Sequence, residues 1–178
     1  VESGLRDATV YVDKTANGQR DVTPTWHVDE ELPYEWPKYF ERTFHFQVSG
    51  LVGAVTRVEV RIKLPGPTSV NTEIDLSSPD RTTCEVVWRP GNYGDGSMPD
   101  MTLADNAERY ATVDDAPYIG RYKPYEPLSV FNGEDPNGEW DLHIGTLYDD
   151  GFVLELLELW IWTTALPEDE PTVVTGAE

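Results

Sequence analysis

Hydrophobic and polar residues alternate with a period of two along much of the chain, which predicts β-strands. The alternation is clearest at 43–48, 57–64 and 73–76, where apolar side chains fall on one face and polar side chains on the other. This pattern is typical of an antiparallel sheet with one face on a core and the other in water. Turn signals separate these segments at Ser49-Gly50, Pro65-Gly66-Pro67, Ser78-Pro79-Asp80 and Asn92-Tyr93-Gly94-Asp95-Gly96. We therefore predict an all-β fold, an antiparallel β-sandwich with jelly-roll topology.

The segment 153–162 is apolar on both faces. Leu and Glu recur along it, so a helix is the alternative, but Leu157, Leu159 and Ile161 also form one face of a strand while Leu156 and Trp162 lie on the other. A strand covered on both sides accounts better for these residues. We expect it to lie centrally in the sandwich.

A turn followed by an alternating strand is predicted near residue 138. Pro136 fixes φ for a turn, and Asn137-Gly138 tolerates positive φ. Apolar and polar residues then alternate in the order Glu139, Trp140, Asp141, Leu142, His143, Ile144. This order predicts a half-buried antiparallel strand.

An EF-hand is the alternative for this segment, because Asp135, Asn137, Glu139 and Asp141 stand at every second position. The EF-hand loop requires Gly at its sixth place and Glu at its twelfth. Trp140 and Thr146 occupy those places here. The turn and strand explain the residues without a metal.

The chain is strongly acidic. Its 33 acidic and 13 basic residues give a formal charge of −20, which argues against nucleic acid or an anionic membrane as a partner and favours cations and basic surfaces. The length of 178 residues suits one domain. Cys84 is the sole cysteine, so no internal disulfide forms. The sequence contains no run of about 18 apolar residues, the length that would predict a membrane-spanning helix.

One segment of the chain reads Leu128-Ser129-Val130-Phe131-Asn132-Gly133-Glu134-Asp135-Pro136-Asn137-Gly138-Glu139-Trp140-Asp141-Leu142. It resembles a hairpin of the P domain, the proprotein convertase domain found beside subtilisin-like serine peptidases, which reads approximately Leu-Ser-x-Phe-x-Gly-x-x-Pro-Asn-Gly-x-Trp-x-Leu. The likeness runs from near Arg42 to Trp162 and includes Leu76-Ser77-Ser78-Pro79, with Arg81 where the family usually has Gly. It implies a P domain at 41–164. Residues 1–40 do not match the family pattern, but they are too aromatic for a disordered tail, so we expect an N-terminal extension packed on the domain, and the acidic residues at 165–178 predict a linker or tail.

The resemblance implies a noncatalytic accessory domain of a secreted, extracellular subtilisin-like serine protease, or of a similar secreted protein. Its partner would be a peptidase or another domain of the same precursor, which it stabilises. The alternative is a freestanding secreted module that binds carbohydrate or protein. Six Trp and nine Tyr favour that alternative, notably Trp26, Tyr34, Trp36 and Tyr39. Coplanar exposed rings along a groove would support the module, and a single bare apolar patch would support the accessory domain.

The chain itself is expected not to be an enzyme. His27, His45 and His143 are scattered, and Ser97 lacks the strand-to-helix context that activates a serine nucleophile. Cys84 alternates with buried-type residues and is expected to be a small core residue.

Calcium is the cofactor that the residues favour. Six carboxylates fall in a loop-rich stretch without Lys, at Asp95, Asp100, Asp105, Glu108, Asp114 and Asp115. By resemblance, Asp95 and Asp105 match acidic positions that bind calcium in some P domains, and Asn71 approaches the same site as a neutral ligand. The predicted metal ligands are Asn71, Asp95, Asp100, Asp105 and Asp115, and the alternative is a solvated acidic loop.

Overall fold

A computed structural model of the chain describes residues 41–65, 72–88, 97–112, 117–146 and 153–165, of which 146 and 153 are described by backbone alone. It also gives the backbone of β1 (Arg6–Val12), β2 (Asp21–Val28), β3 (Tyr34–Glu35) and β13 (Thr172–Thr175). No helix among these residues is long and apolar enough to cross a membrane.

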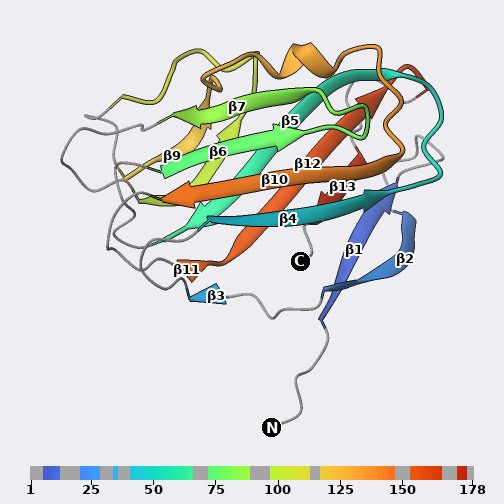
Figure 1. Cartoon of the computed structure of the whole chain (residues 1–178), viewed down its shortest axis with the longest axis horizontal. Helices are drawn as coiled ribbons and strands as arrows, with labels where there is room; N and C mark the ends of the chain where they lie inside the picture. Colours follow the sequence, from blue (N-terminus) through green and yellow to red (C-terminus); the bar gives the residue numbers. More distant parts are fainter. Residues whose placement is uncertain are drawn as a thin grey trace, which may run out of the picture.

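Two sheets form a β-sandwich, as predicted. The front sheet in Figure 1 has the order β4-β10-β6-β7, and all of its pairs are antiparallel. Its strands are β4 (Glu41–Val48), β10 (Gly138–Thr146), β6 (Thr72–Ser77) and β7 (Thr83–Trp88). The predicted jelly-roll connectivity stays a prediction.

The rear sheet has the order β2-β1-β13-β12-β5-β8-β9 and crosses behind the front one. Its other strands are β5 (Val55–Leu64), β8 (Met98–Leu103), β9 (Ile119–Tyr122) and β12 (Leu156–Thr163). Only the β8–β9 pair is parallel among the described pairs of this sheet. A separate pair joins β3 to β11 (Val153–Leu154).

The core lies between the sheets and is built from the alternating positions. The inner face of the front sheet contributes Phe44, Phe46, Val48, Ile74, Leu76, Trp140, Leu142 and Ile144. The rear sheet contributes Val58, Val60, Ile62, Leu64, Met98, Met101, Leu103, Leu157, Leu159 and Ile161. The predicted strands at 43–48, 57–64 and 73–76 are therefore confirmed, and their apolar faces are buried as the period of two requires.

The strand after the Pro136-Asn137-Gly138 turn is confirmed as β10, but it does not form a hairpin with the residues before it. β10 pairs instead with β4 and β6. Residues Leu128–Phe131 form a 3-10 helix, η2, with Leu128 and Phe131 buried. These two side chains are three residues apart, so one turn of 3-10 helix points both toward the core.

The ends of the predicted domain also differ from expectation. Residues 172–175, assigned by sequence to a solvated tail, form β13 between β12 and β1. The predicted strand at 153–162 is interrupted at Glu155, which separates β11 from β12. β12 does lie centrally in the rear sheet, between β5 and β13, as expected.

The two turn motifs of the P domain resemblance lie against each other. Gly138 has a φ of +128°, and a Cβ placed there would lie 2.7 Å from the Cβ of Pro79. Below the turn, the Trp140 indole donates a hydrogen bond to the Pro136 carbonyl at 2.9 Å, and its ring meets Phe131 edge to face at 5.2 Å. These residues therefore act together as a structural unit of the core.

Candidate functional site

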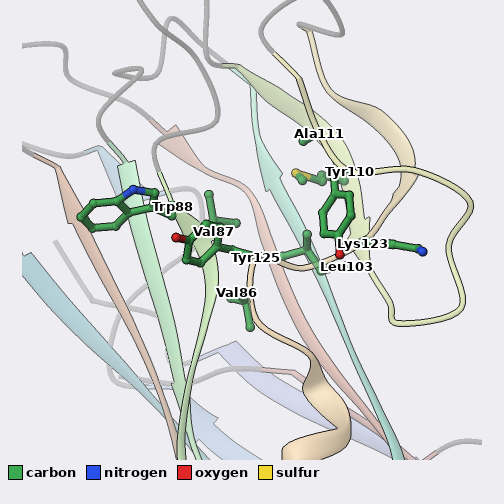
Figure 2. A pocket seen from close by; sticks show the side chains of 9 residues that line it. Val86, Val87, Trp88, Leu103, Tyr110, Ala111, Lys123 and Tyr125 are labelled. Atoms are coloured by element: carbon green, nitrogen blue, oxygen red, sulfur yellow. The ribbon is translucent and has the colours of Figure 1, made fainter.

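Figure 2 shows a cleft of about 430 Å³ at one end of the sandwich. It is lined by residues of β7, β8 and the segments on either side of β9, namely Val86, Val87, Trp88, Met101, Leu103, Tyr110, Ala111, Lys123 and Tyr125. The volume falls within the range of pockets that hold small molecules, roughly 300–1,000 Å³. The cleft opens where the edge strand of the front sheet faces the edge of the rear sheet.

The rim of the cleft is aromatic. Trp88, Tyr125 and Tyr110 are 40%, 56% and 59% exposed, which places them among the exposed large hydrophobic side chains of the described residues. The rings of Trp88 and Tyr125 lie 6.3 Å apart at an interplanar angle of 34°. Across the cleft, the Lys123 ammonium lies 5.6 Å from the centre of the Tyr110 ring. The three aromatic side chains at the rim are therefore partly exposed.

Backbone hydrogen bonds hold the walls of the cleft in place. The N–H of Tyr125 donates to the Val86 carbonyl at 3.0 Å, and the N–H of Glu126 donates to the Glu85 carbonyl at 2.9 Å. The segment at 125–126 thus covers the open edge of β7. On the other wall, Tyr110 and Lys123 form a parallel bridge, and the Lys123 N–H donates to the Arg109 carbonyl at 2.7 Å. The cleft is preformed by main-chain pairing.

Sequence reasoning missed this cleft. Its rim residues come from separate segments of the chain: Tyr110 lies 13 positions before Lys123, and Trp88 lies 37 positions before Tyr125. The aromatic residues that the sequence singled out were Trp26, Tyr34, Trp36 and Tyr39, whose side chains lie outside the described residues. One available signal was Trp88, an aromatic residue at the end of a strand and next to turn-forming residues.

The predicted calcium ligands are described only in part. The Asp100 carboxylate accepts hydrogen bonds from Arg61 at 2.8 and 2.9 Å and lies 3.5 Å from Lys63. The hydrogen bond from Arg61 is the main reason that the pKa of Asp100 lies below its ordinary value. Asn71, Asp95 and Asp115 lie outside the described residues.

Asp105 holds the start of η2. Its two carboxylate oxygens accept hydrogen bonds from the N–H groups of Leu128 and Ser129, at 2.8 and 2.7 Å. Both Asp100 and Asp105 therefore have protein partners that explain their positions. The binding of calcium by the five predicted ligands stays a prediction.

The outer face of the front sheet brings His45, Glu139 and Asp141 together. The Nδ1 of His45 lies 2.6 Å from Asp141 and 3.8 Å from Glu139, and the possible ligand atoms of the three residues all lie within 4.8 Å of one another. The register places Asp141 opposite His45 across β10 and β4. Sequence reasoning placed these side chains correctly on the wet face but did not group them, because their pairing depends on which strands are neighbours.

The expected core role of Cys84 is confirmed. Cys84 is 1% exposed. Burial, and then the negative charge of Glu126, raises the pKa of the thiol to about 12. Ser97 is also buried. The raised pKa keeps the Cys84 thiol protonated near neutral pH.

The chain matches no protein-family model, and no curated protein matches its sequence.

Proposed function

We propose that this chain is a noncatalytic accessory domain of the P domain type, belonging to a secreted subtilisin-like serine protease or a similar secreted protein. In this proposal the chemistry lies in a neighbouring domain of the same precursor, and this domain stabilises that neighbour. The cleft is then a surface at which the domain holds its partner.

The observation that carries the proposal is the way the resemblance motifs come together. Pro79 of the Ser-Pro-Asp turn lies against Gly138 of the Pro-Asn-Gly turn, above the packed pair of Trp140 and Phe131. Residues matched on sequence alone thus form one contiguous unit in a β-sandwich. Contacts of this kind support a fold shared with the P domain, and the accessory role is what the resemblance to that family implies.

The test is the thermal inactivation of the parent polypeptide, purified from its natural source with an antibody against this chain. Its peptidase activity is compared with that of the same polypeptide expressed without residues 41–164. We expect the truncated form to lose activity several-fold faster at elevated temperature. Equal half-lives would contradict the stabilising role.

Calcium belongs to the same proposal. Thermal melts of the chain after chelation, and again with millimolar calcium, should show a rise of several degrees, because an ion at a hundred times its Kd stabilises a fold by about 2.7 kcal/mol. Magnesium is the control, since it favours small octahedral sites. An unchanged melt in calcium would leave the acidic residues as a solvated surface.

A freestanding binding module is the second candidate, and the aromatic rim of the cleft favours it. Trp88 and Tyr125 are exposed neighbours whose rings are tilted by 34° to each other, whereas coplanar rings were expected for a ligand-binding groove. Binding of a ligand by the chain in the absence of any peptidase neighbour would support this candidate.

A further inference from the structure

The cluster of His45, Glu139 and Asp141 lies on the outer face of the front sheet, and the strand register fixes its position. Asp141 stands directly opposite His45 across β10 and β4, and Glu139 stands opposite Gln47, which makes Glu139 a diagonal neighbour of His45. On the other face of both strands the alternate side chains belong to the core. A slip of one residue would bury the cluster and expose those core side chains, so the register is strongly specified.

The three side chains offer one nitrogen and two carboxylate groups at close range. The Nδ1 of His45 lies 2.6 Å from Asp141 Oδ1 and 3.8 Å from Glu139 Oε1, and the three possible ligand atoms all lie within 4.8 Å of one another. Zinc holds imidazole nitrogen and carboxylate oxygen at about 2.0–2.2 Å, so two ligands of one ion lie about 3–4 Å apart. The side chains of His45 and Glu139 are 44% and 47% exposed, so small rotations bring the three atoms into this range.

A neighbour outside the cluster orients the glutamate. The Nε2 of Gln47 donates a hydrogen bond to the Oε2 of Glu139 at 2.5 Å, and the other oxygen, Oε1, is the one that faces His45. Hydrogen bonds to the far side of a metal ligand fix its orientation, and their loss typically weakens metal binding by about 10–100-fold. Gln47 thus holds one oxygen of Glu139 and leaves the other to bind an ion.

The charge of the cluster suits a divalent cation. With a neutral imidazole, the carboxylates of Glu139 and Asp141 together carry two negative charges. Among the described residues, no Lys or Arg forms an ion pair with either of them. The Asp100 carboxylate, by contrast, is already paired with Arg61 and Lys63. A dication would balance the cluster, and the formal charge of −20 on the chain draws cations from solution.

The nitrogen ligand decides the class of ion. Calcium takes roughly six to eight oxygen ligands, and magnesium requires near-octahedral oxygen ligands and keeps several of its waters. Imidazole instead suits zinc, copper and nickel. Three protein ligands leave the fourth position of a tetrahedral zinc ion to water. The cluster therefore favours a transition-metal ion over the calcium expected at the acidic loops.

We propose that His45, Glu139 and Asp141 bind one divalent transition-metal ion of the zinc class, which ties the edge strand β4 to β10. β4 is the outermost strand of the front sheet, and β10 is its neighbour there (Figure 1). One ligand comes from β4 and two come from β10, so the ion links the strands through their side chains. The ion replaces the proton between His45 and Asp141, because a ligating imidazole nitrogen carries no proton. The site is separate from the predicted calcium ligands and does not depend on the accessory role.

Calorimetric titration of the whole chain with zinc at pH 7.5, after treatment with a chelator, tests the site. Calcium and magnesium are titrated separately. We expect the tightest zinc site to hold one ion per chain and to be lost in His45→Ala and Asp141→Asn. Gln47→Ala should weaken the same site about tenfold. Urea unfolding of each metal-free variant checks that it is folded.

His143→Ala is the matched control. His143 lies on the same face of β10 as Asp141, and its Nδ1 lies 3.2 Å from the Oγ1 of Thr43. It is not part of the cluster. The variant removes a histidine from the same sheet face and should leave the zinc Kd unchanged.

Hydrogen exchange tests the link between the strands. Zinc should slow the exchange of the amides at 41–48 several-fold in the unmutated chain, because an edge strand opens more readily when it is held by its backbone alone. The same amides should not respond to zinc in His45→Ala.

Four results would overturn the proposed site: no zinc binding up to millimolar concentration, calcium or magnesium bound as tightly as zinc and lost in His45→Ala, a His45→Ala variant that binds zinc as tightly as His143→Ala, or zinc binding that leaves the exchange of β4 unchanged.

Discussion

Gly138 provides the sharpest test of how the two turns are built. Its φ of +128° is a conformation that residues with a side chain rarely adopt, and a Cβ there would lie 2.7 Å from the Cβ and 3.0 Å from the Cγ of Pro79. The proline ring is part of a turn closed by hydrogen bonds between Ser78 and Arg81 and between Ser78 and Thr82, so it cannot swing aside. Gly133 has a similar φ of +94° but has no atom within 4 Å of its Cβ position.

Two effects would destabilise a variant with a side chain at position 138, namely backbone strain at positive φ and overpacking against Pro79, and the structure lets them be separated. Backbone strain at positive φ costs about 1–2 kcal/mol for a residue with a side chain, and overpacking a well-packed site adds about 1–3 kcal/mol. Gly138→Ala should therefore lower the free energy of unfolding by about 2–5 kcal/mol, and Gly133→Ala by about 1–2 kcal/mol. For a chain of 178 residues the larger change corresponds to a fall in Tm of about 4–20 °C.

The assay is urea unfolding followed by intrinsic fluorescence, with Gly133→Ala as the matched control. A double-mutant cycle with Pro79→Gly completes it, because that substitution removes both carbons that the new methyl group would meet. The double variant should lose less free energy of unfolding than the two single variants lose in sum. Equal destabilisation by Gly138→Ala and Gly133→Ala, or strict additivity in the cycle, would refute the proposed contact between the turns.

Three further outcomes follow from individual residues. Arg81 has a φ of +68°, so Arg81→Gly should relieve strain and raise the Tm by about 2–4 °C in a thermal melt; an unchanged or lower Tm would contradict this. Cys84, with its pKa raised to about 12 by burial, should resist maleimide at pH 8 in the folded chain and react in urea, and rapid labelling of the folded chain would show that the thiol is accessible. The pKa of Asp100 is lowered in the folded state, chiefly by its hydrogen bond from Arg61, so its contribution to stability is present above the unfolded value of about 3.9 and is lost as the pH falls through the folded pKa. Asp100→Asn should therefore lower the Tm at pH 7 and lose its effect in strong acid, and a constant difference across that range would exclude the ionic origin.

Much of the fold could be predicted from the alternation of residues. The period of two identifies β4, β5, β6 and β10 and the faces that they bury, because one buried face fixes which side chains point inward. η2 could not be predicted in this way. It depends on Asp105, 23 positions before Leu128, whose carboxylate binds the first N–H groups of the helix.

The candidate site was less predictable, because it depends on which segments lie together. Trp88 and Tyr125 meet only because the residues at 125–126 cover the edge of β7. The cluster of His45, Glu139 and Asp141 likewise depends on the pairing of β4 with β10. The sequence reports the polarity of each face, while strand order decides which side chains become neighbours.

The central claim, that this chain is the noncatalytic part of a serine peptidase, is tested most directly by fluorophosphonate labelling of material from the natural source, followed by blotting with an antibody against the chain. The account predicts a labelled band that the antibody recognises and that is larger than 20.1 kDa, together with no labelling of the isolated chain. Labelling of the isolated chain itself, or antibody-reactive polypeptides that never carry the label, would contradict it.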